Sequence, residues 1–196
     1  VFRRELRAAC VPIKTVVHFC DHAYAPLVGA CGAAPTVVTC HDMLAVNAAR
    51  GLHPEWQIRW TGRSLQKWIA RGLSRAGTIA CVSDETELQC VTAIPKTRGR
   101  TRVVWNGLNH PFQPMNQAEA TRVIARLCPQ LAGRPFVLHV GSNVWYKNRP
   151  GVLDVFRAYR ASEPQGLRLL TVGEEIPAEQ RASLRAVGLA GEITRV

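Results

Sequence analysis

The sequence predicts an α/β protein built on parallel β-sheets, and two observations carry this prediction. Short apolar runs rich in β-branched residues recur along the 196-residue chain, and helix-length segments lie between most of them. The runs do not alternate strictly between apolar and polar residues, which is typical of parallel strands buried on both faces. Repeated strand–helix–strand units predict a parallel sheet.

Six segments have the composition of such strands. Each is short and rich in branched apolar residues or threonine, as buried parallel strands are. In chain order they are residues 15–19, 36–40, 78–82, 102–105, 135–140 and 167–172.

Helix-start signals lie between or after these segments. Ser83 follows the third strand, and acidic residues stand at 84, 85 and 87, so that a side-chain oxygen and first-turn acids both favour a helix start. Pro150 is placed where the first turn of a later helix tolerates proline. Further helices are predicted near 117–128, 149–161 and 178–187, opened by Asn116, Asn148 and Pro177.

The most turn-rich segment, residues 106–114, separates two blocks of this pattern and predicts a linker. We therefore divide the chain into residues 1–111 and residues 112–196. The first block has 14 basic and 7 acidic residues, and the second has 11 basic and 7 acidic residues.

The composition narrows the choice of partners. The formal net charge is +11, which favours nucleic acid, an anionic membrane surface or phosphorylated small molecules. No helix-turn-helix, zinc-finger or RNA-binding signature is present, so nucleic acid is the least favoured. The seven cysteines form no CxxC pair, which speaks against structural zinc and for buried thiols in a reducing cytosol. No unbroken apolar run is long enough to span a membrane.

A candidate phosphate-binding loop follows the fifth strand. Gly141 and Ser142 allow a ligand to approach the backbone, and Lys147 adds a charge just before Asn148 opens a helix. Ligands bind open parallel sheets beyond the carboxyl ends of the strands, and helix amino ends attract anions through their unpaired N–H groups. The loop suits a diphosphate, although it is neither a P-loop nor a GxGxxG fingerprint. A plain loop with a solvated lysine is the alternative.

Two pairs of histidine and aspartate also follow predicted strands. His41 and Asp42 end the second strand, and Asp21 and His22 follow the first. These positions lie on the ligand side of a parallel sheet, where an imidazole can donate to a substrate hydroxyl or transfer a proton. The alternative is a histidine that only caps the next turn.

Residues 55–76 predict an amphipathic helix with a cationic face. Basic residues recur at every fourth position and form one stripe, and Trp56 and Trp60 extrapolate to the same face. Leu65 and Trp68 are expected on the opposite, apolar side. The face suits an anionic bilayer or nucleic acid, and the alternative is an ordinary solvated surface. Its five cations are Arg59, Arg63, Lys67, Arg71 and Arg75.

Six motifs follow one another along almost the whole chain. They are VVHFCDH (16–22), PTVVTCHD (35–42), ACVS (80–83), VVWNGL with FQP (103–108, 112–114), FVLHVG with YKNRPGVL (136–141, 146–153) and LLTVG (169–173). In this order they resemble the GT4-type (group 1) retaining glycosyltransferases. The first three are similar to the amino-terminal domain of that family, the fourth to its interdomain crossover, and the last two to the start of its donor-binding domain.

The resemblance implies a GT-B fold, in which two Rossmann-like domains face each other across a cleft. Residues 1–111 would be the carboxyl-terminal part of the acceptor-side domain, and residues 112–196 the first part of the nucleotide-sugar-binding domain, both incomplete. It implies transfer of a sugar from a nucleotide-sugar donor to a glycan or lipid-linked acceptor with retention of configuration. No cofactor and no metal ion are expected.

The same resemblance assigns roles to individual residues. His41 is expected to be catalytic, facing the sugar and the acceptor, and Lys147 to hold the donor diphosphate. Tyr146 stands where many relatives have an arginine. Gly141, Ser142 and Asn148 are expected beside the diphosphate, and the further cleft residues are expected to be Asp42, His22, Asn106, Gly107, Gly173 and Glu174.

The family's glycine-rich loop and its acidic donor motif are not among these 196 residues. We therefore expect a central fragment that is inactive alone, from an enzyme at the cytoplasmic face of the cell membrane. The alternative is a basic α/β module that binds phosphate, a membrane or nucleic acid without catalysis.

Overall fold

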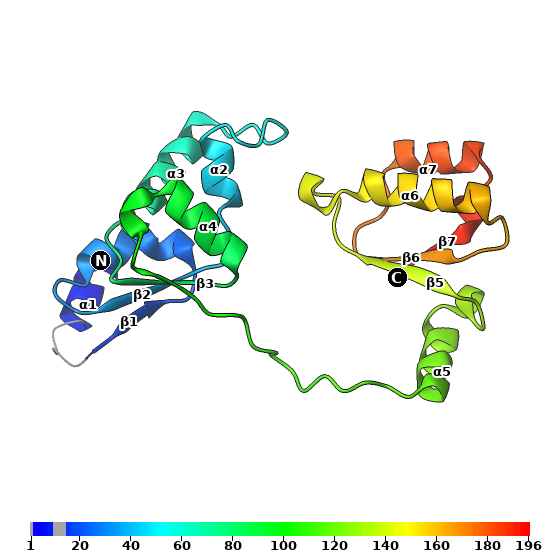
Figure 1. Ribbon diagram of the computed structural model, residues 1–196, viewed down its shortest axis with the longest axis horizontal. Helices are drawn as coiled ribbons and strands as arrows, with labels where there is room; N and C mark the ends of the chain where they lie inside the picture. Colours follow the sequence, from blue (N-terminus) through cyan, green and yellow to red (C-terminus); the bar gives the residue numbers. More distant parts are fainter. Residues whose placement is uncertain (1, 10–14) are drawn as a thin grey trace. The chain divides into compact units, whose positions relative to one another are not determined.

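The computed structural model describes residues 2–9 and 15–196. The chain forms two compact units, Val1–His110 (unit 1) and Pro111–Val196 (unit 2). In each unit the described strands pair in parallel, with helices between them (Figure 1). The predicted parallel α/β class is therefore confirmed.

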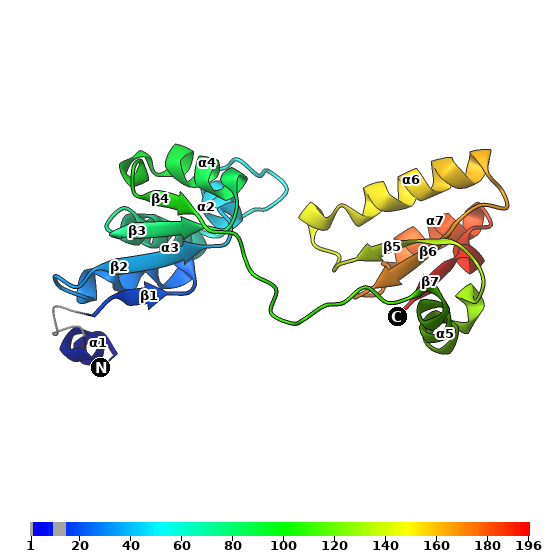
Figure 2. The ribbon, with the colours of Figure 1, turned by 60° about the horizontal axis from the view of Figure 1, so that its bottom comes forward.

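Unit 1 is built on a four-stranded sheet in the order β1-β2-β3-β4 (Figure 2). The strands follow the predicted segments closely, and Cys40 at the end of β2 is the register partner of Cys81 at the end of β3. The elements are α1 (Phe2–Ala9), β1 (Val17–Phe19), η1 (His22–Ala30), β2 (Thr36–Cys40), α2 (Leu44–Ala49), α3 (Trp60–Leu73), β3 (Thr78–Cys81), α4 (Asp84–Ala93), η2 (Pro95–Thr97) and β4 (Thr101–Val103).

Only one face of this sheet is fully buried. In β2, Thr36, Val38 and Cys40 are buried, whereas Val37 and Thr39 between them are half-buried. Each strand lies beside its predecessor, so right-handed crossovers carry the connecting helices to the same face. The expectation that the strands are buried on both faces is therefore wrong for unit 1.

The core of unit 1 lies between the sheet and these helices and contains fifteen buried hydrophobic residues among those described. Helix α3 lies directly against η1. A Cβ atom on Gly72 would overlap the main-chain carbonyl of Ala25, so this close approach requires glycine. The helix begins at Trp60 rather than near residue 55 as predicted.

Unit 2 is built on a three-stranded sheet in the order β5-β6-β7. Helices α6 and α7 cover one face, and α5 with η3 packs on the other through Leu131 and Leu170 (Figure 1). The elements are α5 (Gln117–Leu127), η3 (Pro129–Leu131), β5 (Phe136–Val140), η4 (Trp145–Lys147), α6 (Arg149–Ser162), β6 (Arg168–Val172), α7 (Ala178–Ala186), η5 (Ala190–Glu192) and β7 (Ile193–Arg195).

The two long strands of unit 2 differ in burial. In β6, Leu169 and Leu170 are 1% and 5% exposed, because helices pack on both faces of this central strand. In β5, Val137 and Leu138 are 44% and 53% exposed. The prediction of a strand buried on both faces is correct for β6 and wrong for β5, which is an edge strand of this sheet.

The predicted helix starts are confirmed. Ser83 accepts a hydrogen bond from the N–H of Thr86, and Asn116 accepts one from the N–H of Glu119. No helix within residues 2–9 and 15–196 combines the length and the hydropathy that crossing a membrane requires.

Candidate functional site

The predicted phosphate loop begins where β5 and β6 end side by side. The N–H of Gly141 donates to the carbonyl of Val172 at 3.0 Å. Gly173 follows with a φ of 122°, and a Cβ atom on it would overlap the carbonyl of Gly141. Because an L side chain rarely adopts this backbone conformation, glycine is required here. The structure thus brings together two of the predicted site residues.

Behind this loop lies Arg149, which the sequence analysis did not single out. Its side chain is only 2% exposed, and its guanidinium donates to the carbonyls of Gly141 and Glu174, the latter at 2.5 Å. The Nε atom is buried without a hydrogen-bond partner, and no described carboxylate pairs with the group. Burying a cation without a counter-ion costs free energy. The uncompensated charge also makes this part of the loop strongly positive.

The side chain of Lys147 lies beside the same glycine. It is exposed, and its Cγ and Cδ atoms lie 3.4 Å from the point where Gly141 would carry a Cβ. The ammonium group is 5.8 Å from the centre of the Tyr146 ring. The tyrosine therefore supports the lysine by a cation–π contact.

His139 is a further residue that the sequence analysis did not select. Its Cε1 atom also lies 3.4 Å from the Cβ position of Gly141. Its Nδ1 atom is buried and has no hydrogen-bond partner among the described residues. The histidine beside Gly141 therefore keeps a buried polar nitrogen without a partner among the described residues.

The predicted cleft residue Glu174 orders the loop. Its carboxylate accepts a hydrogen bond of 2.8 Å from the N–H of Asn143. The side chain of Asn143 in turn donates to the carbonyl of Glu175 at 2.8 Å. The segment after β6 thereby holds the loop after β5 in one conformation.

Asn148 caps helix α6 and reduces the supply of free N–H groups there. It adopts a left-handed φ of 45°, and its side chain accepts from the N–H of Gly151 at 3.2 Å. The N–H of Val152 bonds to the Asn148 carbonyl, and Pro150 has no N–H. The expected row of free helix N–H groups is therefore largely occupied. Ser142, half-buried, forms no hydrogen bond with a described residue.

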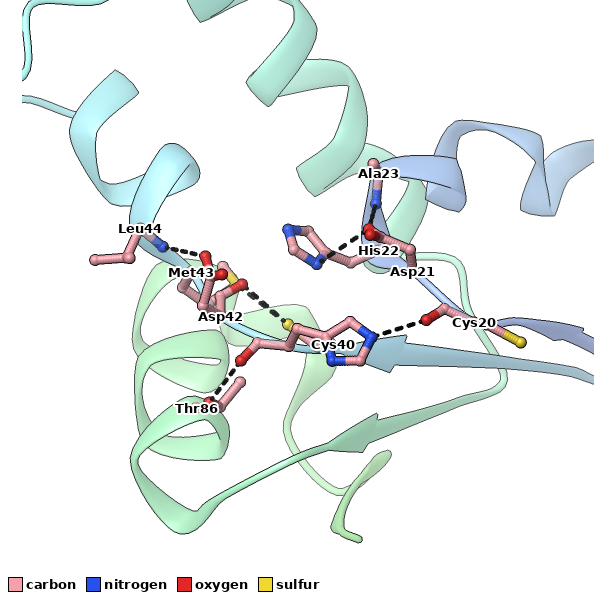
Figure 3. A network of polar contacts seen from close by, with 10 residues as sticks. Cys20, Asp21, His22, Ala23, Cys40, Asp42, Met43, Leu44 and Thr86 are labelled. Atoms are coloured by element: carbon pink, nitrogen blue, oxygen red, sulfur yellow. Dashed lines mark hydrogen bonds and ion pairs between the residues drawn. The ribbon is translucent and has the colours of Figure 1, made fainter. Parts of the chain in front are cut away.

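In unit 1, His41 connects the ends of two neighbouring strands. Its Nε2 atom lies 2.9 Å from the carbonyl of Cys20, at the end of β1 (Figure 3). A carbonyl only accepts, so Nε2 carries the hydrogen, and the neutral ring keeps Nδ1 as an acceptor. The side chain is exposed, so this nitrogen can receive a hydrogen bond or a proton from a ligand.

The other predicted polar residues at this edge cap turns. Asp42 accepts from the N–H of Leu44 at 2.9 Å, and Asp21 accepts from the N–H of Ala23 at 2.7 Å (Figure 3). His22 is half-buried with Nδ1 3.6 Å from an Asp21 oxygen. The two aspartates therefore cap turns, whereas His41 bonds to the carbonyl of Cys20 and keeps its other ring nitrogen available.

Three cysteine thiols lie together in the core of unit 1. Cys40, Cys81 and Cys90 are fully buried. Hydrogen bonds with the thiols of Cys81 and Cys90, together with burial, raise the pKa of Cys40 above its ordinary value. Cys40 is thereby kept neutral, as expected for a structural thiol. Among the described residues, no group of three or more His, Cys, Asp or Glu is arranged to hold a metal ion.

Asn106 and Gly107, which were expected in the cleft, follow β4. Both are exposed, and Asn106 forms no hydrogen bond with a described residue. Nothing in their geometry marks them as part of a site.

The cationic face of α3 exists, with more apolar surface than predicted. Trp60 is 75% exposed among the cations, and Leu65 and Trp68, expected on the buried side, are 47% and 48% exposed. The buried side is formed by Ile69, Gly72 and Leu73, because η1 covers a narrower strip of the helix than a full apolar face. All five predicted cations are exposed: Arg59, Arg63, Lys67, Arg71 and Arg75.

No protein-family profile matches this chain, and no curated protein sequence is significantly similar to it.

Proposed function

We propose that unit 2 binds the diphosphate of a nucleotide sugar at the loop from Gly141 to Asn148. One observation carries the proposal: the side chains of two basic residues, buried Arg149 and exposed Lys147, meet at Gly141, at the carboxyl ends of β5 and β6. A phosphate group placed over Gly141 supplies the counter-ion that Arg149 lacks among the described residues. The carboxyl ends of parallel strands are also where such sheets bind ligands.

We further propose that the chain is part of a GT4-type retaining glycosyltransferase of the GT-B fold. The ordered motifs support this, as do parallel sheets in both units. In the reaction, the bond between the sugar and the diphosphate breaks and negative charge grows on the leaving diphosphate. Lys147 and Arg149 stabilise that charge. The Nδ1 atom of His41 is the group in unit 1 suited to the sugar or the acceptor hydroxyl.

The remaining proposals follow from this activity. The donor is a nucleotide sugar and the acceptor is a glycan or a lipid-linked glycan, with neither metal nor cofactor. The parent enzyme lies at the inner face of the cell membrane, and the exposed Trp60 among the cations of α3 supports contact with an anionic bilayer.

Binding of a nucleoside diphosphate to the full chain tests the first proposal. By calorimetry, Lys147→Ala should weaken the affinity by about tenfold, because one charge-assisted contact is lost. Lys96→Ala is the matched control, since Lys96 is an exposed lysine in unit 1. Equal affinities of the two variants would remove Lys147 from the site.

A phosphate-binding module without catalysis is the second candidate. It is favoured by the capped turns of Asp42 and Asp21, which give these carboxylates a structural role. Incubating the chain with labelled nucleotide sugars separates the candidates, because glycosyl transfer or donor hydrolysis that is lost in His41→Ala supports the enzyme. Binding with no turnover in the chain or in any longer form of it supports the module.

A further inference from the structure

A basic cavity lies in unit 1, at the end of the sheet opposite His41. It has a volume of about 410 Å³ and is formed by α1, η1 and α3. Arg75 lies between the end of α3 and the start of β3, and Gly29 and Ala30 lie in the last turn of η1, before β2. These are the amino ends of the strands, whereas His41 follows the carboxyl end of β2. The cavity is therefore separate from the edge that carries His41.

Every charged side chain that lines this cavity, among the described residues, is an arginine. Arg4 and Arg7 share one face of α1, because they are three residues apart. Arg75, which follows α3, lines the same cavity. None of the three guanidinium groups has a hydrogen bond or an ion pair with a described residue. Like charges around one cavity repel each other in the free protein, and a bound dianion removes that repulsion.

The rest of the lining defines the shape of the ligand. Gly29 carries no side chain, and the Nη1 atom of Arg75 lies 3.7 Å from the point where its Cβ would be. Trp68, which is 48% exposed, also lines the cavity and contributes aromatic surface to it. The volume exceeds what a phosphate ion occupies and falls in the range of organic ligand sites. The lining thus suits a phosphate group attached to an organic residue that lies against the indole.

We propose that this cavity is a binding site for a phosphate monoester, with Arg4, Arg7 and Arg75 on the phosphate and Trp68 against its organic part. Planar guanidinium groups bind phosphate oxygens in pairs, which is why arginine rather than lysine suits such a site. The proposal does not depend on glycosyl transfer or on the loop in unit 2. The same chemistry is offered by a soluble phosphate ester and by the headgroup of phosphatidic acid.

Two probes distinguish these sources. Glycerol 3-phosphate is titrated into the full chain by calorimetry, and vesicles of phosphatidylcholine with and without phosphatidic acid are sedimented with it. Binding of glycerol 3-phosphate supports a soluble ligand. Binding only to vesicles with phosphatidic acid, when it requires Arg7 and Arg75, supports a lipid headgroup. Binding of neither probe overturns the proposal.

Four variants test whether binding requires this cavity or only the positive charge of unit 1. Arg7→Gln and Arg75→Gln should each weaken binding by about tenfold through loss of a guanidinium–phosphate pair. Gly29→Leu should weaken it as much by filling the cavity while the charge stays the same. Arg98→Gln, which removes an exposed arginine of unit 1 outside the cavity, should change affinity by less than about twofold.

Two controls test whether each variant is folded and whether the ligand binds in unit 1. Circular dichroism of each variant must match the parent chain, and Lys147→Ala must retain binding, which assigns the ligand to unit 1. Equal losses in Arg98→Gln and Arg75→Gln, or unchanged binding in Gly29→Leu, would show general electrostatic attraction and overturn the proposal. Loss in Lys147→Ala would overturn it also, by moving the ligand to unit 2.

Discussion

In each unit a glycine lets two segments of the main chain touch, and the two contacts serve different purposes. In unit 1, Gly72 of α3 lies against the carbonyl of Ala25 in η1, inside a core of fifteen buried hydrophobic residues. In unit 2, Gly173 lies against the carbonyl of Gly141 at a polar edge, where two basic side chains meet. The same steric device thus packs a core in one unit and shapes a candidate binding loop in the other.

The largest effect is expected from Gly72→Ala. The added methyl group meets backbone, which cannot move without separating α3 from η1, so unit 1 should lose about 3 kcal/mol of stability. The loss is measured by chemical denaturation, with hydrogen exchange used to monitor the unfolding of each unit. Arg71→Ala, at an exposed position on the same helix, should change stability by less than about 0.5 kcal/mol. Equal stability of both variants would contradict the close contact.

Gly173→Ala should have the next largest effect, about 2 kcal/mol in unit 2, because the new side chain combines an unfavourable φ with overlap at Gly141. It should also weaken binding of a nucleoside diphosphate, since the loop must move away from β6. Gly191→Ala is the control in the same unit, because a Cβ there has no neighbour within 4 Å. A variant that loses stability but binds normally would separate the glycine contact from the site.

Arg149→Met should change ligand affinity more than the stability of unit 2. Two hydrogen bonds to carbonyls are lost, and a buried cation without a counter-ion is removed, so the two effects on stability oppose each other. Affinity for a nucleoside diphosphate should fall by about tenfold, as expected for loss of one charge contact. Calorimetry and thermal denaturation of the same sample measure both quantities. A large loss of stability with unchanged affinity would make Arg149 purely structural.

The smallest effect is expected from chemical modification of the cysteines, which requires no substitution. In native protein, iodoacetamide should modify exposed Cys20, while Cys40, Cys81 and Cys90 stay unmodified. The thiolate is the nucleophile, and both burial and the raised pKa of Cys40 keep that thiol neutral. Mass spectrometry of peptides before and after denaturation measures the difference. Rapid modification of Cys40 in folded protein would mean that the core of unit 1 opens readily.

Local signals predicted the strands, the helix caps and the loop after β5. Ser83, Asn116 and Asn148 cap helices as predicted, because an N-cap depends on residues within one turn of itself. The presence of Gly141 and Lys147 in one site was also predictable, since strand and helix starts place them there. Burial was predicted less well: β5 has the composition of a central strand and lies at an edge.

Arg149 shows most clearly what could not be predicted from the sequence. In the sequence it is a first-turn arginine, a position where side chains usually reach solvent, and nothing near it in the chain indicates burial. Only the tertiary structure brings the carbonyls of Gly141 and Glu174 to either side of its guanidinium. The cavity of Arg4, Arg7 and Arg75 has the same origin, because α1 and α3 are far apart in sequence.

The sequence by itself therefore determined the class of fold, the order of strands and helices and the loop that carries Lys147. These depend on backbone preferences and on patterns that repeat within a few residues. The tertiary structure decided which sheet faces are covered, which cations have no counter-ion and where two glycines allow backbone contact. Those properties depend on groups distant in the chain, and desolvation and charge pairing are settled only when the chain packs.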